Sequence, residues 1–300
     1  MRGRLIPKPL TTAPMFNDYQ TIVKHLGDLP PMPAVAIKVL ELLRNPYCSA
    51  KLLAKAISHD AAVSGRILRI ANSPIYGRQK RVTTLEGAIV VLGENILRTL
   101  VLETSLRGIN KSFGRLERML WEDSIGCAIG ARILARHLGQ ADPEETFIAG
   151  LFRHIGKVVM SNHDKDTYQR VMETARTANE GLIDVERAFF AFSHELVGAA
   201  VLDNWNLAPA LVQSALHHHD LQLDPQCDAQ VWHQVAIVNI AGQFCRRLGI
   251  GQETPQPELN LTLTPGAIHL KLGSEPLEKT LGELEALFEK ERDFFLVPAR

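Results

Sequence analysis

The sequence predicts an all-α protein built as a two-lobed helical bundle. Apolar residues recur at spacings of three and four residues along most of the chain up to about residue 250, which is the pattern of amphipathic helices. Apolar and polar residues alternate, as in a β-strand, only in Asn260–Thr264 and Ala267–Leu272, two short segments that would also suit a loop. The stretch Gly108–Gly114 interrupts the helical pattern and is the predicted junction between the lobes.

The first lobe begins after the extended stretch Leu29–Pro33, whose prolines exclude a helix. Cap residues then mark the start of each helix, because Ser, Thr and Asp side chains accept hydrogen bonds from free backbone N–H groups. The expected caps are Ser49, Asp60, and Thr83 or Thr84. The helices expected in this lobe are Val35–Leu43, Leu52–Ser58, Ala62–Ala71, Leu85–Leu92, which Gly93 ends, and one that starts near Glu94.

The second lobe continues the helical pattern, and Pro143 and Pro209 stand where helices would begin. Residues 1–24 are expected to form a flexible leader. Residues 251–300 are expected to form an extension that packs on the second lobe and contains a last amphipathic helix, Leu277–Phe288. The helices expected in the second lobe are Leu116–Leu138, Glu144–Asn162, Tyr168–Asn179, Ile183–Ala191, His194–Trp205, Ala208–His217 and Gln230–Leu248.

The charge balance argues against nucleic acid as a partner, and the length of the apolar runs argues against a membrane span. Lys and Arg together number 33, as do Asp and Glu, so the chain has no overall basic field to attract nucleic acid. Nowhere do 18 or more apolar residues follow one another, so we expect no membrane span. The N-terminal stretch lacks the apolar core of a signal peptide, and we therefore expect a cytoplasmic location.

Histidines are concentrated in the second lobe. Helical metal hydrolases build their sites from imidazoles and carboxylates that converge from several helices. In a regular helix, however, successive side chains point about 100° apart, so His217, His218 and His219 cannot all face one point. We expect one of them to face a cleft, or all three to form a polar helix end. Among the histidines of this lobe are His154, His163, His194, His217, His218, His219 and His233.

The segment Ala149–Lys157 combines glycines with buried polar candidates. Gly150 and Gly156 would let neighbouring backbones approach closely. Arg153 and His154 stand in an otherwise apolar helix, where polar groups need partners.

Several motifs resemble the HDOD domain family over roughly residues 25–250. In the first lobe they are LPPMPAVAIKVLELL (29–43), AISHDAAVSGRILRIANSPIYG (56–77) and TTLEGAIVVLGENILRTLVLE (83–103). In the second they are AGLFRHIGKVV (149–159), SHELVGAAVLDNW (193–205) and ALHHHD (215–220). The resemblance implies a first helical lobe over 25–110 and a second lobe over 111–250 that is similar to the HD and HD-GYP phosphohydrolases.

When the metal motif of those hydrolases is carried over to this sequence position by position, its residues are replaced by others. The early histidine of those enzymes would fall at Asp123, their His-Asp pair at Arg153 and His154, and their later aspartate at Asn239. The extra histidines of the HD-GYP branch would fall at His194 and at His218 or His219, and these are kept.

These substitutions predict a non-enzymatic module with a vestigial pocket. A guanidinium at position 153 is a permanent cation, and its repulsion of a divalent ion in a partly buried pocket would cost several kcal/mol. We expect no catalytic residue and no metal, and a signalling or regulatory role through protein partners in trans. The expected pocket residues are Asp123, Arg153, His154, Lys157, His194, His218, His219 and Asn239.

Two alternatives remain for this pocket. A relocated site of Asp123, His154, His194 and His218 would hold a divalent metal such as Fe, Mn or Ni and would make the chain a phosphohydrolase of a cyclic nucleotide or another phosphodiester. Without a metal, Arg153, His154 and Lys157 would suit a bound anion or nucleotide.

The first lobe offers candidates for partner binding. The resemblance marks Asn72, Ser73 and Tyr76, although a structural helix cap and turn would explain them equally. A basic strip nearby would be a solvated face or would bind an acidic partner; it consists of Arg66, Arg69, Arg78, Lys80 and Arg81.

Overall fold

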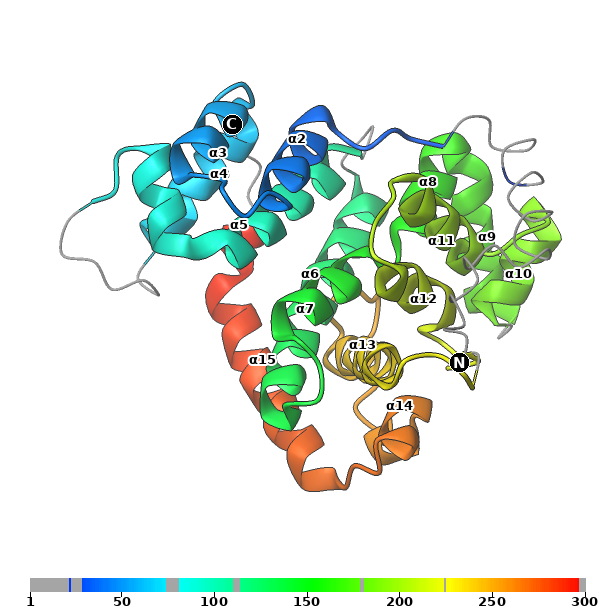
Figure 1. The fold of residues 1–300 in the computed structure, drawn as a ribbon. Helices are drawn as coiled ribbons and strands as arrows, with labels where there is room; N and C mark the ends of the chain where they lie inside the picture. The colour runs from blue at the N-terminus through cyan, green and yellow to red at the C-terminus, as the bar shows by residue number, and fades with distance from the viewer. Residues whose placement is uncertain are drawn as a thin grey trace, which may run out of the picture.

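In the computed structural model, every regular element of the described residues is a helix, as the sequence predicts (Figure 1). It describes residue 22 and residues 29–73, 81–109, 114–178, 181–223 and 225–296. No strand occurs within these ranges. Tyr76, Arg78, Lys80 and the leader apart from Ile22 lie outside the described residues.

The first lobe contains α2 to α5, and the second lobe begins with α6. A short 3₁₀ turn, η2, precedes the last two helices. The bounds are α2 Ala34–Leu43, α3 Ala50–Ile57, α4 Ala61–Ala71, α5 Leu85–Ile109, α6 Arg115–Leu138, α7 Pro143–Phe152, α8 Ile155–His163, α9 Lys165–Ala178, α10 Leu182–Phe190, α11 His194–Asn204, α12 Pro209–His217, α13 Ala229–Leu248, η2 Leu261–Leu263, α14 Pro265–His269 and α15 Ser274–Leu296.

The predicted caps of the first lobe are confirmed. The Ser49 side chain accepts a hydrogen bond from the backbone N–H of Leu52, and Asp60 accepts one from that of Val63. Thr84 accepts one from the backbone of Gly87. Gly93 adopts φ 78° inside α5, so it separates two helical segments as expected.

The structure corrects two predictions of local structure. The segments with an alternating pattern form η2 and α14, because Asn260 and Thr264 cap successive helical turns through their side chains. The single helix expected over Glu144–Asn162 is two helices, α7 and α8, separated by Arg153 and His154.

The second lobe is organised around α6, which packs against α7, α13 and α15. Helix α11 lies between α8 and α12, and α5 contacts both α7 and α8. Figure 1 shows α15 running along the outside of the second lobe from α14 back toward the first lobe. Most of the buried apolar side chains of both lobes form one continuous cluster. None of the described helices combines the length and the apolar character that crossing a bilayer would need.

Two polar contacts tie distant segments together. The indole N–H of Trp205, at the end of α11, donates to the backbone carbonyl of Pro30 at 2.8 Å. Arg66 is buried and pairs with the buried Glu103 at 2.6 Å, which joins α4 to α5. The interpretation of Arg66 as part of a solvated basic strip was therefore wrong, because its guanidinium is directed into the lobe toward a carboxylate.

The close approach predicted at the glycines of Ala149–Lys157 is confirmed. A Cβ at Gly150 would lie 3.0 Å from the backbone of Ala128 in α6. At Gly156 it would lie 1.9 Å from the carbonyl oxygen of His194, so only glycine lets α8 pack on the start of α11.

We expect Gly156→Ala to lower the free energy of unfolding by about 3 kcal/mol or more, since the clash is with backbone and cannot be relieved by a rotamer change. The matched control is Gly65→Ala in α4, where a Cβ meets nothing within 4 Å. It should raise stability by about 0.5–1 kcal/mol through helix propensity. Chemical denaturation of both variants measures the difference, and similar behaviour of the two would contradict this packing.

Candidate functional site: a four-histidine cluster beside a buried ion pair

The break between α7 and α8 positions the first two site residues. Arg153 still has helical angles, φ −53° and ψ −32°, but His154 has φ −106° and ψ 16°. Because the helix does not continue regularly, two consecutive side chains can reach the same group on α6. That group is Asp123, which is 3% exposed.

Asp123 is the acceptor at the centre of this arrangement. The Arg153 Nη2 donates to both carboxylate oxygens, at 2.9 and 2.8 Å, and Nη1 donates to the Asp123 backbone carbonyl at 3.3 Å. The His154 Nδ1 lies 2.6 Å from Oδ2, and the Gln252 amide donates to Oδ1 at 3.3 Å. Burial alone would lower the pKa of Arg153, but Asp123 together with the neighbouring Cys127 and Cys245 outweighs this effect and raises the pKa. Arg153 is therefore a buried cation held in a salt bridge with Asp123.

A second buried carboxylate, Glu186 of α10, holds the start of α11. It accepts the backbone N–H of His194 at 2.9 Å and lies 2.6 Å from the His194 Nδ1. The Tyr168 hydroxyl donates to its other oxygen at 2.9 Å. Ser193 occupies the expected cap position, yet its hydroxyl donates to Glu195 and makes no cap bond to the helix.

The turn after α12 brings two adjacent histidines to the same place. Helix α12 ends at His217, so the expectation that only one side chain of the run would face the site was wrong: both His218 and His219 face it. The Asn239 amide donates to the carbonyls of His218 and His219, at 2.8 and 3.3 Å. Its oxygen accepts the backbone N–H of Gly266 at 2.9 Å. Asn239 therefore fixes this turn.

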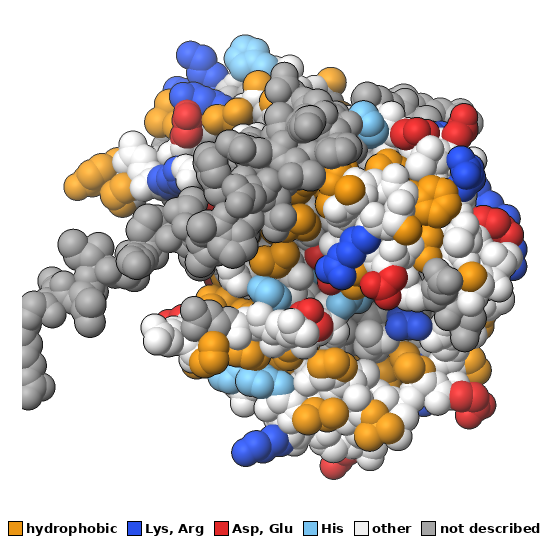
Figure 2. Space-filling view, turned by 90° about the vertical axis from the view of Figure 1, so that its right-hand side faces the viewer, with side chains coloured by type: hydrophobic (Ala, Val, Ile, Leu, Met, Phe, Trp, Pro, Cys, Tyr) orange, Lys and Arg blue, Asp and Glu red, His pale blue; other side chains and the backbone are white. Residues whose placement is uncertain are grey.

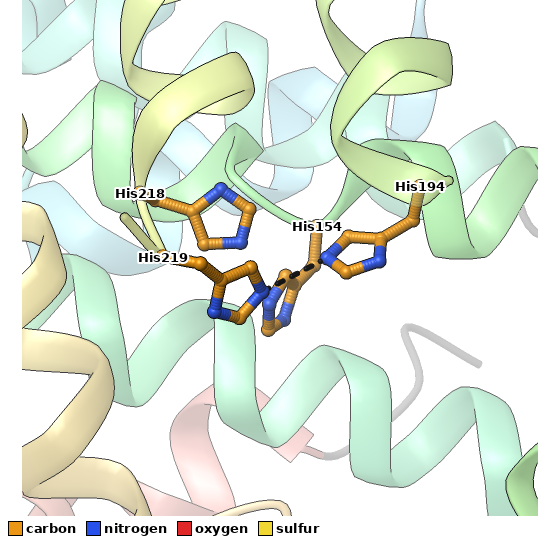
Figure 3. Close-up of side chains that lie close together, drawn as sticks. All are labelled: His154, His194, His218 and His219. Atoms are coloured by element: carbon orange, nitrogen blue, oxygen red, sulfur yellow. Dashed lines mark hydrogen bonds between the residues drawn. The ribbon is translucent and has the colours of Figure 1, made fainter. Parts of the chain in front are cut away.

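Four imidazoles consequently converge, as Figure 3 shows: His154, His194, His218 and His219. One ligand nitrogen from each lies within 4.8 Å of the others. The Nε2 atoms of His194 and His219 are 3.2 Å apart. The Nε2 atoms of His154 and His218 are buried and lack a hydrogen-bond partner among the described residues. Buried polar atoms without partners are rare in native proteins, and a bound ion or water is a usual reason for them.

The four imidazoles are neutral. Burial lowers the pKa of His154 and His218 well below the usual value, and neighbouring cationic groups add to this effect. Burial also lowers the pKa of His194 despite Glu186, and that of His219 to about 2. Neutral imidazole is the form that ligates a metal, so the residues present fit a transition-metal ion.

The cluster opens onto a pocket of about 1170 Å³. Burial lowers the pKa of Lys157 there to about 8, against the opposing effect of Asp123 and Glu186. Burial raises the pKa of Glu195, also in the wall, to about 7. On the face in Figure 2, basic and acidic side chains of the described residues are interspersed.

The structure places most of the expected pocket residues together. The wall contains Asp123, Arg153, His154, Lys157, His218, His219 and Asn239, while His194 is fully buried in the cluster. Of the four residues expected for a relocated metal site, Asp123 is engaged by Arg153, and His219 takes its place in the cluster. Glu186 was missed, because only the fold brings α10 beside α11.

The partner-binding candidates of the first lobe lie elsewhere. Asn72 is the C-cap of α4, and its amide bridges Leu68 and Val82 through hydrogen bonds of 2.7 to 2.8 Å. Ser73 follows it directly. The partner-binding role of these residues stays a prediction.

Comparison with known proteins fits this architecture. A sequence model of the HDOD domain matches residues 29–221. The chain belongs to the HDOD domain family. An uncharacterised protein of Treponema pallidum (strain Nichols) is 23% identical over 274 residues, which is 91% of this HDOD chain but 52% of that protein. The chain therefore spans about half the length of this relative.

Solved structures share the fold of this HDOD chain. An HDOD domain protein of unknown function from Geobacter sulfurreducens is 21% identical with a TM-score of 0.72, covering 95% of this chain and 96% of that one. A protein from Shewanella amazonensis SB2B, provisionally named a phosphohydrolase, is 22% identical with a TM-score of 0.70. The match covers 92% of this chain and 98% of that one. A protein from Marinobacter aquaeolei VT8, provisionally named a signal transduction protein, is 16% identical with a TM-score of 0.66. The match covers 96% of this chain and 66% of that one. At these identities the likeness shows the fold.

We expect Asp123→Asn to lower the free energy of unfolding by about 3–5 kcal/mol, because an amide leaves the buried Arg153 charge uncompensated. The control is Glu41→Gln in the exposed Lys38–Glu41 pair at 3.4 Å, which should change stability by less than about 1 kcal/mol. Urea unfolding measures the free energy of unfolding of both variants, with an m-value equal to that of the parent chain. An equal effect of the two substitutions would contradict a buried, ionised pair.

Proposed function

We propose that this chain is a non-hydrolytic regulatory HDOD module that acts in the cytoplasm through protein partners in trans. The observation that carries the proposal is the buried Arg153–Asp123 ion pair. It fills the positions at which the resemblance to HD hydrolases would place two metal ligands.

The chemistry of hydrolysis supports this proposal. A metal hydrolase needs an ion with an open coordination position at which water becomes hydroxide. Here both oxygens of Asp123 accept from Arg153, and one also accepts from His154. The oxygens of Glu186 accept from Tyr168 and His194. Neither carboxylate is left to bridge an ion and a water.

The pocket gives this module a place for a small ligand. Lys157 and Arg153 lie in its wall beside His154, and groups of this kind suit a phosphate or a nucleotide. In the proposed role such a ligand would bind without being cleaved and would alter how the module engages its partner.

A metal-dependent phosphohydrolase is the second candidate function. The four-histidine cluster favours it, together with Glu195, whose pKa of about 7 suits a group that exchanges protons near neutral pH. In that case the chemistry would use a rearranged set of ligands.

A hydrolysis assay separates the two functions. The purified chain is incubated with Fe²⁺, Mn²⁺ or Ni²⁺ and with a generic phosphodiester and cyclic dinucleotides. We expect no turnover above the metal-only background. Metal-dependent turnover that disappears in a folded His154→Ala variant would establish the hydrolase and reject the regulatory proposal.

The partner is tested by reconstitution. Proteins that co-purify with the tagged chain from its source bacterium are expressed separately and mixed with the pure chain. We expect one of them to form a complex of defined stoichiometry in light scattering. If every candidate elutes apart from the chain at micromolar concentration, the proposed action in trans fails.

A further inference from the structure

We propose that His154, His194, His218 and His219 together bind one divalent ion of the zinc, cobalt or nickel type, with all four imidazoles as ligands. The inference goes beyond the regulatory function, which needs no metal, and it holds or fails separately from it. It replaces the expectation of an empty vestigial pocket and differs from the relocated site in its fourth ligand.

The first argument is the way the rings are held. His154 Nδ1 is fixed by Asp123 at 2.6 Å and His194 Nδ1 by Glu186 at 2.6 Å. His218 Nδ1 donates to the carbonyl of Ala215 at 2.9 Å. Metal-ligating histidines donate their second nitrogen to a carboxylate or a carbonyl in this way, which fixes the tautomer and directs the Nε2 lone pair at the ion.

The second argument is the pair of unsatisfied atoms. With Nδ1 protonated, the Nε2 atoms of His154 and His218 are acceptors, yet the described part of the chain offers them no donor. Both side chains are more than nine-tenths buried. A shared ion would satisfy both lone pairs and would also explain why His194 and His219 turn their Nε2 atoms toward each other.

The third argument concerns distance and charge. Nitrogens at about 2.0–2.1 Å from a tetrahedral ion lie about 3.3 Å from one another, close to the 3.2 Å between His194 and His219. The other ligand atoms would draw in from their present spread. Asp123 and Glu186, behind the rings, offset part of the ion's charge, and the Arg153 cation is already bonded to Asp123.

The ligand set selects the ion. Four imidazoles and no carboxylate suit Zn²⁺, Co²⁺ or Ni²⁺, whereas Mg²⁺, Ca²⁺ and Mn²⁺ prefer oxygen ligands. Four protein ligands also close a tetrahedral site, as in structural zinc centres, and leave no position for a reactive water. A bound ion is therefore compatible with a module that does not hydrolyse phosphodiesters.

The experiment uses the full chain without a polyhistidine tag, stripped of metal with a chelator and titrated with Zn²⁺, Co²⁺ or Mg²⁺. We expect one Zn²⁺ or Co²⁺ per chain by elemental analysis, a rise in melting temperature, and the intense visible absorption of four-coordinate Co²⁺. Mg²⁺ should cause none of these changes. A chain that takes up neither Zn²⁺ nor Co²⁺, or a weak six-coordinate Co²⁺ spectrum, would overturn the inference.

Variants locate the ion. His218→Gln and His219→Gln should each weaken Zn²⁺ binding at least 100-fold, whereas Glu186→Gln should weaken it about 10–100-fold, the usual effect of losing a group that orients a ligand. The matched control is His217→Gln, at the end of α12 next to these residues but outside the cluster, and it should bind as the parent does. Circular dichroism establishes that each metal-free variant is folded.

Unchanged binding in a folded His218→Gln or His219→Gln variant would overturn the four-histidine site. If one of the two fails to fold, the other decides. The zinc-loaded chain then enters the hydrolysis assay: binding without turnover supports both proposals, whereas binding with turnover keeps the metal site and rejects the regulatory function.

Discussion

The buried salt bridge between Asp123 and Arg153 is the constraint on which the candidate site depends. It stabilises a permanent cation inside the second lobe, and the same carboxylate also fixes the ring of His154. Removing either charge would leave the other buried and unpaired, so this region of the core has little freedom to change one residue at a time. The pair also determines which nitrogen of His154 faces the four-histidine cluster, because Asp123 bonds to Nδ1 of that ring.

Most of the fold could be predicted from local rules. Side-chain caps such as Asp60 and prolines such as Pro143 act through hydrogen bonds and φ angles within one turn, so the sequence alone determines them. The break between α7 and α8 could not be predicted this way. Residues 149–159 contain no proline and retain an apolar pattern, and the helix is interrupted where Arg153 and His154 both bond to Asp123, which lies 30 and 31 positions earlier. That contact exists only after α6 and α7 have packed.

The candidate site was predictable in its residue types and less so in its arrangement. Family resemblance marked His154, His194 and the histidine run, since their motifs are long and ordered. It could not indicate that α12 ends at His217 and that the turn after it directs both following rings into the cluster. Glu186 carried no local signal, because its role depends on α10 lying beside the start of α11. Tertiary contacts decide such details.

The hydrogen bond from Trp205 to Pro30 ties the end of α11 to the first lobe. This helix has 11 residues, is about 16 Å long, and begins at His194 of the four-histidine cluster. Trp205 follows its last residue, and the indole donates a hydrogen bond to Pro30 at the start of the first lobe. The same indole meets the ring of Phe152 edge-on, one residue before the guanidinium. A single helix therefore connects the four-histidine cluster to the proline-rich segment at the start of the first lobe.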